Sequence, residues 1–158
     1  MNADAGAAVQ ARLARLGYAL PAPLPAKGRY VRARRWQGTL WVSGHTGRGP
    51  EGLRVTGTVG DDVTIEQAQE EARRAAVNLL AAVDGAIGLA EVKALLHLRG
   101  FVRAVPGFGD HTVVVDAASA LLCEALGEIG EHARTAIGVA SLPGGAAVEL
   151  EAVFACAH

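Results

Sequence analysis

The spacing of apolar residues in two long segments most strongly constrains how this chain can fold. Between residues 65 and 87, apolar side chains recur every three or four positions, which is the period of one helix face. Thr64 followed by Gln67 has the spacing of a capping box at the start of that helix. Residues 111–129 repeat the helical period. Two such helices predict a neighbouring layer whose apolar side they cover.

Segments of alternating polarity around these helices predict strands. Residues 29–44 contain two β-prone runs and predict a hairpin, and residues 53–60 predict a third short strand. Residues 91–105 alternate with period two, and two final strands are expected at residues 134–141 and 147–156. The residues expected on one face of the 91–105 strand are Val92, Ala94, Leu96, Leu98 and Val102, with Leu95 on the other face.

The order of elements is therefore β-β-β-α-β-α-β-β, which predicts an α+β fold with a single sheet and both helices on one face of it. The length of 158 residues fits one domain, residues 1–158. Residues 7–20 carry apolar side chains at helical spacing and predict a further short helix. Residues 1–23 are thus expected to form an N-terminal helical extension and a proline-containing linker.

The sheet face away from the helices is expected to be apolar. In the last strand, Leu150 falls on the side expected to meet the helices, and Glu149 and Glu151 fall on the other side. In the hairpin, Trp41 points to the opposite side from Leu40. A second face with such side chains is too hydrophobic to remain in water, so we expect it to be buried against other copies of the chain.

Composition and charge argue against several classes of function. The formal net charge is -1 and the sequence pI is about 6.5, so no overall field attracts nucleic acids or anionic membranes. Cys123 and Cys156 lack the paired spacing of a zinc site, and the histidine spacing does not predict a metal site. The start lacks the apolar centre of a secretion signal, and there is no apolar run of the roughly 18 residues that a membrane span needs. We expect a cytoplasmic protein without membrane contact.

One apolar stretch, HARTAIGVASLPGGAAVELEAV at residues 132–153, nevertheless holds Arg134, Glu149 and Glu151. From the spacing alone, the first interpretation is that Arg134 and one glutamate pair across neighbouring strands. The second is a ligand site, since a guanidinium flanked by small residues such as Ala136 has room to bind a carboxylate through two hydrogen bonds.

This stretch resembles the signature segment of the Rid family, the reactive intermediate deaminases that are also called the YjgF family. In that family an Ala-Arg-Ser/Thr start, a Leu-Pro turn and a Val/Ile-Glu-Ile/Leu-Glu-Ala end recur. GRYVRARRWQGTLWVSGHTG is similar to the family's Gly-x-Tyr hairpin that ends in Ser-Gly-Gln, and TGTVGDDVTIEQAQEEARRAAVNLLAAV is similar to its third strand and first helix. The resemblance runs from about residue 24 to residue 156, and the helix at residues 7–20 suggests a side branch of the family.

The resemblance implies a fold like that of chorismate mutase from bacilli, a homotrimer, and clefts between subunits that bind small carboxylates. It implies that Arg134 holds the substrate carboxylate and that Glu149 positions a water molecule. That water attacks an imine derived from an enamine such as 2-aminoacrylate, and ammonia and a keto acid are released. Tyr30 would line the cleft, and backbone groups near Gly44 and Ala136 would help to hold the ligand. Orientation and one basic carboxylate suffice for so reactive an imine, so no metal or cofactor is expected.

Three positions depart from the family pattern. Ala136 stands where the family usually has Cys, His45 stands where Gln follows Ser-Gly, and Asp116 aligns with an Asn that contacts the ligand. A carboxylate at Asp116 would repel a substrate carboxylate. Arg134 and Glu149 are unchanged.

Two other functions stay open from the sequence. A non-catalytic binder of keto acids would use the same cleft. An RNA-cleaving or RNA-binding protein would use the basic run at residues 27–35. The cations of that run are Lys27, Arg29, Arg32, Arg34 and Arg35. For this run, a solvated sheet edge or ion pairs between subunits is the preferred interpretation, so nucleic acid is not an expected partner.

Overall fold

The computed structural model describes residues 2–157, with side chains from residue 5 onward. The helices are α1 (Asn2–Arg15), α2 (Ile65–Ile87) and α3 (His111–Leu126), and the strands are β1 (Ala33–Trp36), β2 (Thr39–His45), β3 (Val92–Arg103), β4 (Ala133–Val139) and β5 (Val148–Cys156). Three short 3-10 turns, η1 (Leu89–Glu91), η2 (Gly127–Gly130) and η3 (Pro143–Gly145), connect them.

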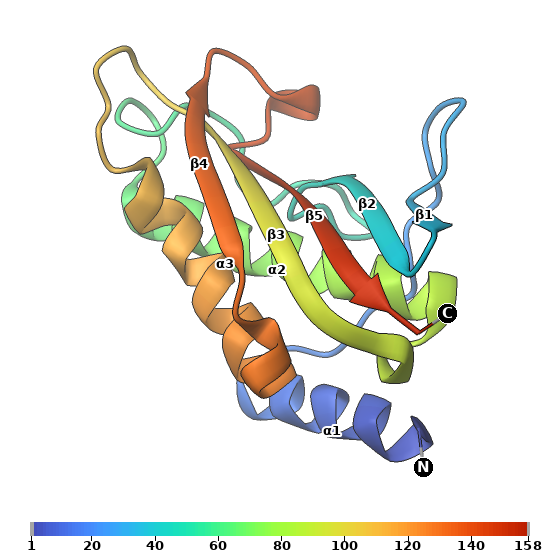
Figure 1. The fold of residues 1–158 in the computed structure, drawn as a ribbon. Coiled ribbons are helices and arrows are strands. Elements are labelled where there is room, and N and C mark those ends of the chain that lie inside the picture. Colours follow the sequence, from blue (N-terminus) through green and yellow to red (C-terminus); the bar gives the residue numbers. More distant parts are fainter. Residues whose placement is uncertain (1, 158) are drawn as a thin grey trace.

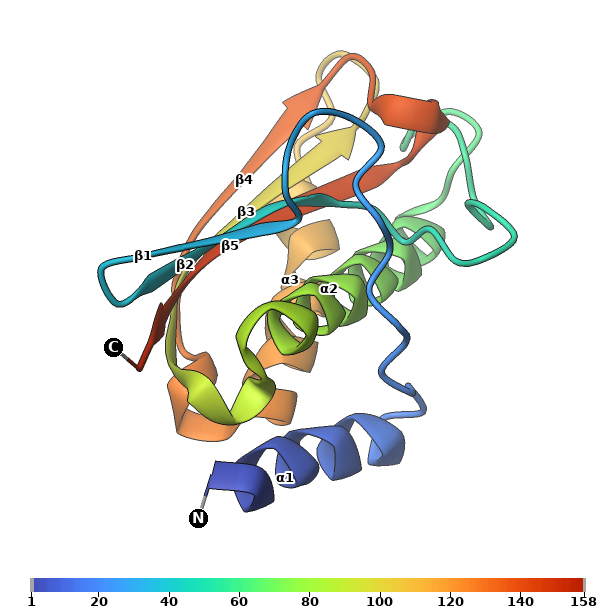
Figure 2. The same ribbon diagram turned by 90° about the vertical axis from the view of Figure 1, so that its right-hand side faces the viewer.

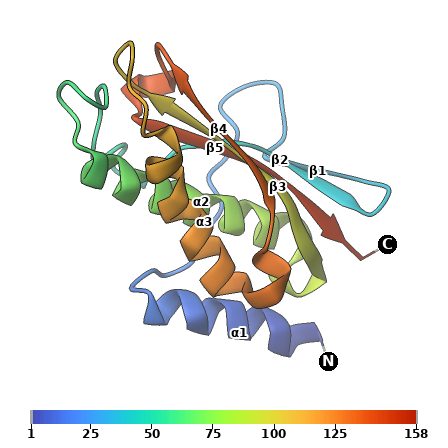
Figure 3. The ribbon, with the colours of Figure 1, turned by 60° about the vertical axis from the view of Figure 1, so that its left-hand side comes forward.

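The five strands form one sheet in the order β1-β2-β5-β3-β4 (Figure 1). Neighbouring strands are antiparallel except for β3 and β4, which are parallel. Helices α2 and α3 cover one face of the sheet, and α1 packs against α3 and the η1 turn (Figures 2 and 3). Among the residues that the structure describes, none forms a helix on the other face. The predicted α+β architecture, with one sheet and two helices on one face, is therefore confirmed.

The core is built from small aliphatic side chains. The Thr64 hydroxyl accepts from the Gln67 backbone N–H at 3.2 Å and the Gln67 side chain accepts from the Thr64 backbone N–H at 2.9 Å, so the predicted capping box starts α2. Along α2, Ala68, Ala72 and Ala76 are fully buried. Because an alanine side chain is short, α2 can approach the sheet and α3 closely.

The prediction of a third strand at residues 53–60 is wrong. Residues 53–60 make only isolated bridges, among them Thr56 with Ala146 and Val59 with Ala104. Gly57 has φ +136° and Gly60 has φ +90°, and these positive values break the extended run that the alternating side chains suggested.

The N-terminal helix also differs from its predicted limits. It begins before residue 7 and ends at Arg15, followed by Gly17 with φ +87°. Leu20, at the end of the predicted range, lies beyond the helix but still packs against the core.

Two β-bulges change the predicted faces of β3. The register with β5 shifts between Val92 and Ala94 and again between Leu95 and His97. Each bulge inserts one residue and reverses the alternation that follows it. As a result Leu95 is buried in the core and Leu96 is 44% exposed, the reverse of the sequence prediction.

The helix-free face exposes large apolar side chains. Trp41 on β2 is 58% exposed, and Leu96 on β3 and Ile137 on β4 are exposed with it. This agrees with the expected apolar character of the face, and its burial against other copies stays a prediction. In the described part of the chain, no helix combines the length and apolar composition that crossing a membrane requires.

Candidate functional site

A cavity of about 260 Å³ lies where the end of β2, the start of β5 and the connector before β1 meet. Three of the predicted site residues, Tyr30, Gly44 and Glu149, line it together. Arg32 and His45 line it as well. The structure thus brings together half of the predicted site, from segments more than a hundred residues apart.

Glu149 is the carboxylate of this cavity, and Gly44 makes room for it. A side-chain carbon added to Gly44 would lie 2.1 Å from Oε1 of Glu149, so the carboxylate keeps this position only because residue 44 has no side chain. Burial raises the pKa of Glu149, the Glu151 charge raises it further, and the Arg32 charge opposes both. A raised pKa makes this carboxylate a better proton acceptor than an ordinary surface glutamate.

Arg32 ties the connector to the sheet. Its guanidinium donates to the backbone carbonyls of Leu24 at 3.2 Å, of Pro25 at 2.9 Å and 3.2 Å, and of Gly44 at 3.4 Å. It also lies 5.8 Å from the centre of the Tyr30 ring. The sequence alone predicts Arg32 to lie in a solvated basic run, whereas the folded connector places it in the wall of the Glu149 cavity.

His45 is a further polar residue in the wall of this cavity. It is 3% exposed, and its Nδ1 lies 2.6 Å from the Ser43 carbonyl oxygen. Burial lowers the pKa of His45 to about 4, the bond to Ser43 opposes this, and the Arg32 charge adds to the lowering. The ring is therefore neutral at pH 7.

The other predicted residues, Arg134, Ala136 and Asp116, gather on the outer edge of the sheet. Nη1 of Arg134 donates to Asp116 Oδ1 at 2.7 Å and to Ser119 Oγ at 3.1 Å, and both partners belong to α3. Arg134 keeps 22% of its side chain exposed and Asp116 keeps 74%. Ala136, two residues along β4, packs partly against the core. Within residues 2–157, both contacts of Arg134 use one nitrogen, so its remaining N–H groups are available to a ligand.

A short hydrogen-bond chain, missed from the sequence, supports Arg134. Nε2 of His132 lies 3.0 Å from Ser119 Oγ, and Nδ1 of His132 lies 2.6 Å from the Gly130 carbonyl oxygen. Because a carbonyl only accepts, Nδ1 carries the hydrogen in the neutral ring and Nε2 accepts the Ser119 hydroxyl proton. The Ser119 oxygen is then oriented to accept from Arg134. Ser119 has no sequence signal because the partners lie on different elements.

Arg134 and Glu149 do not meet within one chain. Strand β3 lies between β4 and β5, so the assumption that these two strands are neighbours is wrong. Arg134 contacts α3 on the helix-covered face, whereas Glu149 lies on the alternate, helix-free side of β5. The prediction of a cross-strand ion pair between Arg134 and a glutamate is therefore also wrong. Asp116 pairs with Arg134, and Glu151 pairs with Arg99 at 2.7 Å.

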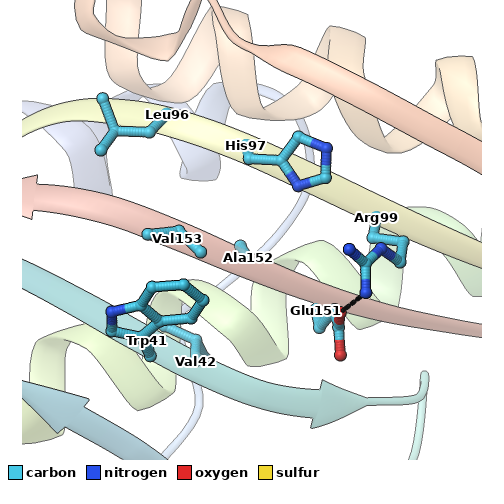
Figure 4. A pocket seen from close by; sticks show the side chains of 8 residues that line it. All are labelled: Trp41, Val42, Leu96, His97, Arg99, Glu151, Ala152 and Val153. Atoms are coloured by element: carbon cyan, nitrogen blue, oxygen red, sulfur yellow. Dashed lines mark hydrogen bonds and ion pairs between the residues drawn. The ribbon is translucent and has the colours of Figure 1, made fainter.

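A second hollow, of about 390 Å³, lies on the helix-free face (Figure 4). Trp41, Leu96 and Val153 line one end of it, and the Arg99–Glu151 ion pair closes the other end. The helices lie behind the sheet in this view, so the hollow opens away from them. Its mixture of exposed apolar groups and one ion pair is typical of a surface that another protein chain covers.

Comparison with known proteins agrees with this architecture. Protein TCP17 of Trypanosoma cruzi is 37% identical over 155 residues, which cover 97% of each chain. The crystal structure of Atu1372 from Agrobacterium tumefaciens is 37% identical, covers 98% of this chain and 96% of its own, and superposes with a TM-score of 0.92. RidA from the Antarctic bacterium Psychrobacter shares the fold, with a TM-score of 0.60 at 24% identity over 85% of this chain and 93% of its own.

These likenesses define the class of protein as α+β with a chorismate-mutase-like sheet and helices. The model of the family Endoribonuclease L-PSP matches residues 21–156. The chain belongs to this family, which is the YjgF/RidA family, and the resemblance drawn from its motifs is confirmed.

Proposed function

We propose that the protein hydrolyses the carbon–nitrogen double bond of a small imine that bears a carboxylate, in a cleft formed by two copies of the chain. The observation that carries this proposal is the burial and raised pKa of Glu149 in its cavity. Glu149 is a half-buried carboxylate with a raised pKa, it rests against Gly44, and it lines a cavity of about 260 Å³ beside Tyr30. A carboxylate in this setting is suited to accept a proton from water.

The chemistry follows from that proton transfer. Glu149 accepts a proton from a water molecule while the water oxygen bonds to the imine carbon. The electron pair of the carbon–nitrogen double bond moves to nitrogen, which takes up a proton. In the resulting carbinolamine the hydroxyl proton passes to the nitrogen, the carbon–nitrogen bond breaks to release ammonia, and the carbon–oxygen bond becomes the carbonyl of a keto acid. Imine and water thus give keto acid and ammonia.

The guanidinium of Arg134 supplies the anchor for the substrate carboxylate. Its planar fork suits two parallel hydrogen bonds to a carboxylate. Asp116 is mostly exposed and competes for the same fork, so a substrate must displace it or share the guanidinium with it. An ion pair this exposed holds the arginine only weakly.

Two copies are needed because one chain separates the two halves of the site. Arg134 lies at the β4–α3 edge and Glu149 lies on the far side of β3, on the other face. An edge of one copy placed against the Glu149 cavity of the next would bring both to one ligand. The exposed apolar face around Trp41 supports such association, and a closed ring of three copies repeats one such contact three times.

Ammonia release from freshly generated imino acids, such as the imine formed from 2-aminoacrylate, tests the proposal. We expect turnover by the wild type and its loss in Arg134→Ala and in Glu149→Gln. Ammonia release that Arg134→Ala leaves unchanged would overturn the assignment of the anchor. Saturable binding of keto acids without turnover would instead support a non-catalytic binder in the same cleft.

A second candidate function is cleavage or binding of RNA. It is favoured by the exposed cations Lys27, Arg29, Arg34 and Arg35, beside the exposed ring of Trp36. Titration with single-stranded RNA at two salt concentrations tests it. Binding that weakens in Arg34→Ala but not in Arg134→Ala supports this function, and no binding at low salt excludes it.

A further inference from the structure

Arg134 makes two contacts with α3, and they differ in kind. Nη1 of Arg134 donates to the Asp116 carboxylate at 2.7 Å and to the Ser119 hydroxyl oxygen at 3.1 Å. Asp116 keeps 74% of its side chain exposed, so water screens this ion pair and it holds the guanidinium weakly. Ser119 is less exposed, and a second group holds its oxygen from the other side. Ser119 is therefore the better-fixed partner of Arg134.

The second group is the ring of His132, the residue directly before β4. Its Nδ1 donates to the Gly130 carbonyl oxygen at 2.6 Å, so in the neutral ring Nε2 accepts the Ser119 hydroxyl hydrogen at 3.0 Å. Each link of this chain donates in one direction, away from the guanidinium. The Ser119 hydrogen is already used, so Ser119 meets Arg134 only as an acceptor.

An arginine that binds a carboxylate must be ordered before or during binding. Its side chain has several rotatable bonds, and fixing them during binding lowers the affinity. A partner that fixes the guanidinium in the free protein removes that loss from the binding step. Both α3 contacts use Nη1 of Arg134, so Nη2 and Nε remain for two hydrogen bonds to a carboxylate.

We propose that Ser119 and His132 are positioning residues, which hold Arg134 in the orientation that binds the substrate carboxylate. The inference rests on the proposed function, in which Arg134 is the anchor of that carboxylate. It assigns opposite effects to two contacts of one nitrogen atom. Asp116 competes with the substrate for the guanidinium, whereas Ser119 keeps the guanidinium in place for the substrate.

Calorimetry with pyruvate, a small keto acid, measures the anchor without turnover. We expect Ser119→Ala to bind pyruvate about tenfold more weakly than the wild type, the effect of losing one hydrogen bond. Ser119→Thr keeps a hydroxyl group, and we expect it to restore most of the affinity. Asp116→Asn should bind pyruvate more tightly than the wild type. Equal affinities of Ser119→Ala and the wild type would overturn the inference.

Variants of His132 and Cys123 separate positioning from packing. His132→Leu removes the acceptor of the Ser119 hydrogen and should weaken pyruvate binding, whereas His132→Gln keeps an acceptor oxygen and should bind nearly as the wild type does. Cys123 is the matched control. Its thiol donates to the same Gly130 carbonyl at 3.4 Å, so Cys123→Ala disturbs this corner without removing a link of the chain. An equal loss of affinity in Cys123→Ala and His132→Leu would assign the effect to packing and overturn the inference.

Steady-state ammonia release from imino acids gives a second readout. A bound substrate itself holds Arg134, so Ser119→Ala should raise KM about tenfold and leave kcat nearly unchanged. A fall in kcat at unchanged KM overturns the positioning role. Failure of the proposed function has a different signature, since the wild type would then release no ammonia although its affinity for pyruvate depends on Ser119. A wild type that binds pyruvate no better than Arg134→Ala refutes both the anchor and its positioning.

Discussion

Acidification should destabilise the protein through His45. The ordinary pKa of histidine is 6.5, and burial lowers that of His45 to about 4. Between these values the unfolded chain binds a proton that the folded chain does not. Keeping His45 neutral therefore costs the folded state nothing above pH 6.5. As the pH falls from 6.5 toward 4, protonation of His45 in the unfolded chain lowers the free energy of unfolding. At 1.36 kcal/mol for each pKa unit, the loss amounts to about 3 kcal/mol.

Urea unfolding of the wild type and of His45→Gln at pH 7 and at pH 4, followed by far-ultraviolet circular dichroism, measures this loss. Glu71 and Glu149 have pKa values raised by burial and act in the opposite direction, but both proteins contain them. Subtracting the change in unfolding free energy of the variant from that of the wild type therefore isolates the contribution of His45. We expect the wild type to lose about 3 kcal/mol more than the variant. An equal loss in both proteins would show that His45 is not held neutral by the fold.

Three further predictions concern the two halves of the site. Gly44→Ala would place a carbon 2.1 Å from Glu149 Oε1. The carboxylate must then shift by about 1 Å, and kcat should fall by roughly 100-fold with little change in thermal midpoint. Gly109→Ala, which meets open space, is the control, and equal activities would refute the argument. Asp116→Asn should lower KM about fivefold by removing a competitor for Arg134, and an unchanged KM contradicts this. Glu149→Gln should raise the free energy of unfolding at pH 7 while abolishing turnover, because burial disfavours the charged carboxylate, and a less stable variant contradicts this.

The helices were predictable because their signals are local. The capping box at Thr64 and the apolar period after it lie within one segment, and α2 spans Ile65–Ile87 as that pattern indicates. The strand at residues 53–60 failed because alternation says nothing of backbone dihedral angles. Gly57 and Gly60 adopt positive φ values, which end an extended strand.

The arrangement of the site depended on information that a single segment does not hold. The motif match selected Tyr30, Gly44 and Glu149, and the fold does place them in one cavity. It did not indicate that Arg134 belongs to a separate edge, because the insertion of β3 between β4 and β5 follows from the packing of the whole sheet. The inward position of His45 depends on a bulge, which adds one residue without any change in polarity pattern.

The polar partners of Arg134 could not be predicted from the sequence either. Asp116 and Ser119 follow each other by three residues on α3 and so share a helix face. That they face β4 and not solvent depends on how the helix rotates against the sheet. The hydrogen bond between Ser119 and His132 could be predicted only after this rotation was known.

Mixed assemblies test most directly whether Arg134 of one copy and Glu149 of another act on one substrate. Arg134→Ala and Glu149→Gln should each be inactive alone. When the two are unfolded together, refolded in equal amounts and assayed for ammonia release, about one quarter of the sites should combine an intact Arg134 with an intact Glu149, restoring about one quarter of wild-type activity. If the mixture stays as inactive as its parents although mass spectrometry shows mixed oligomers, the shared cleft is contradicted.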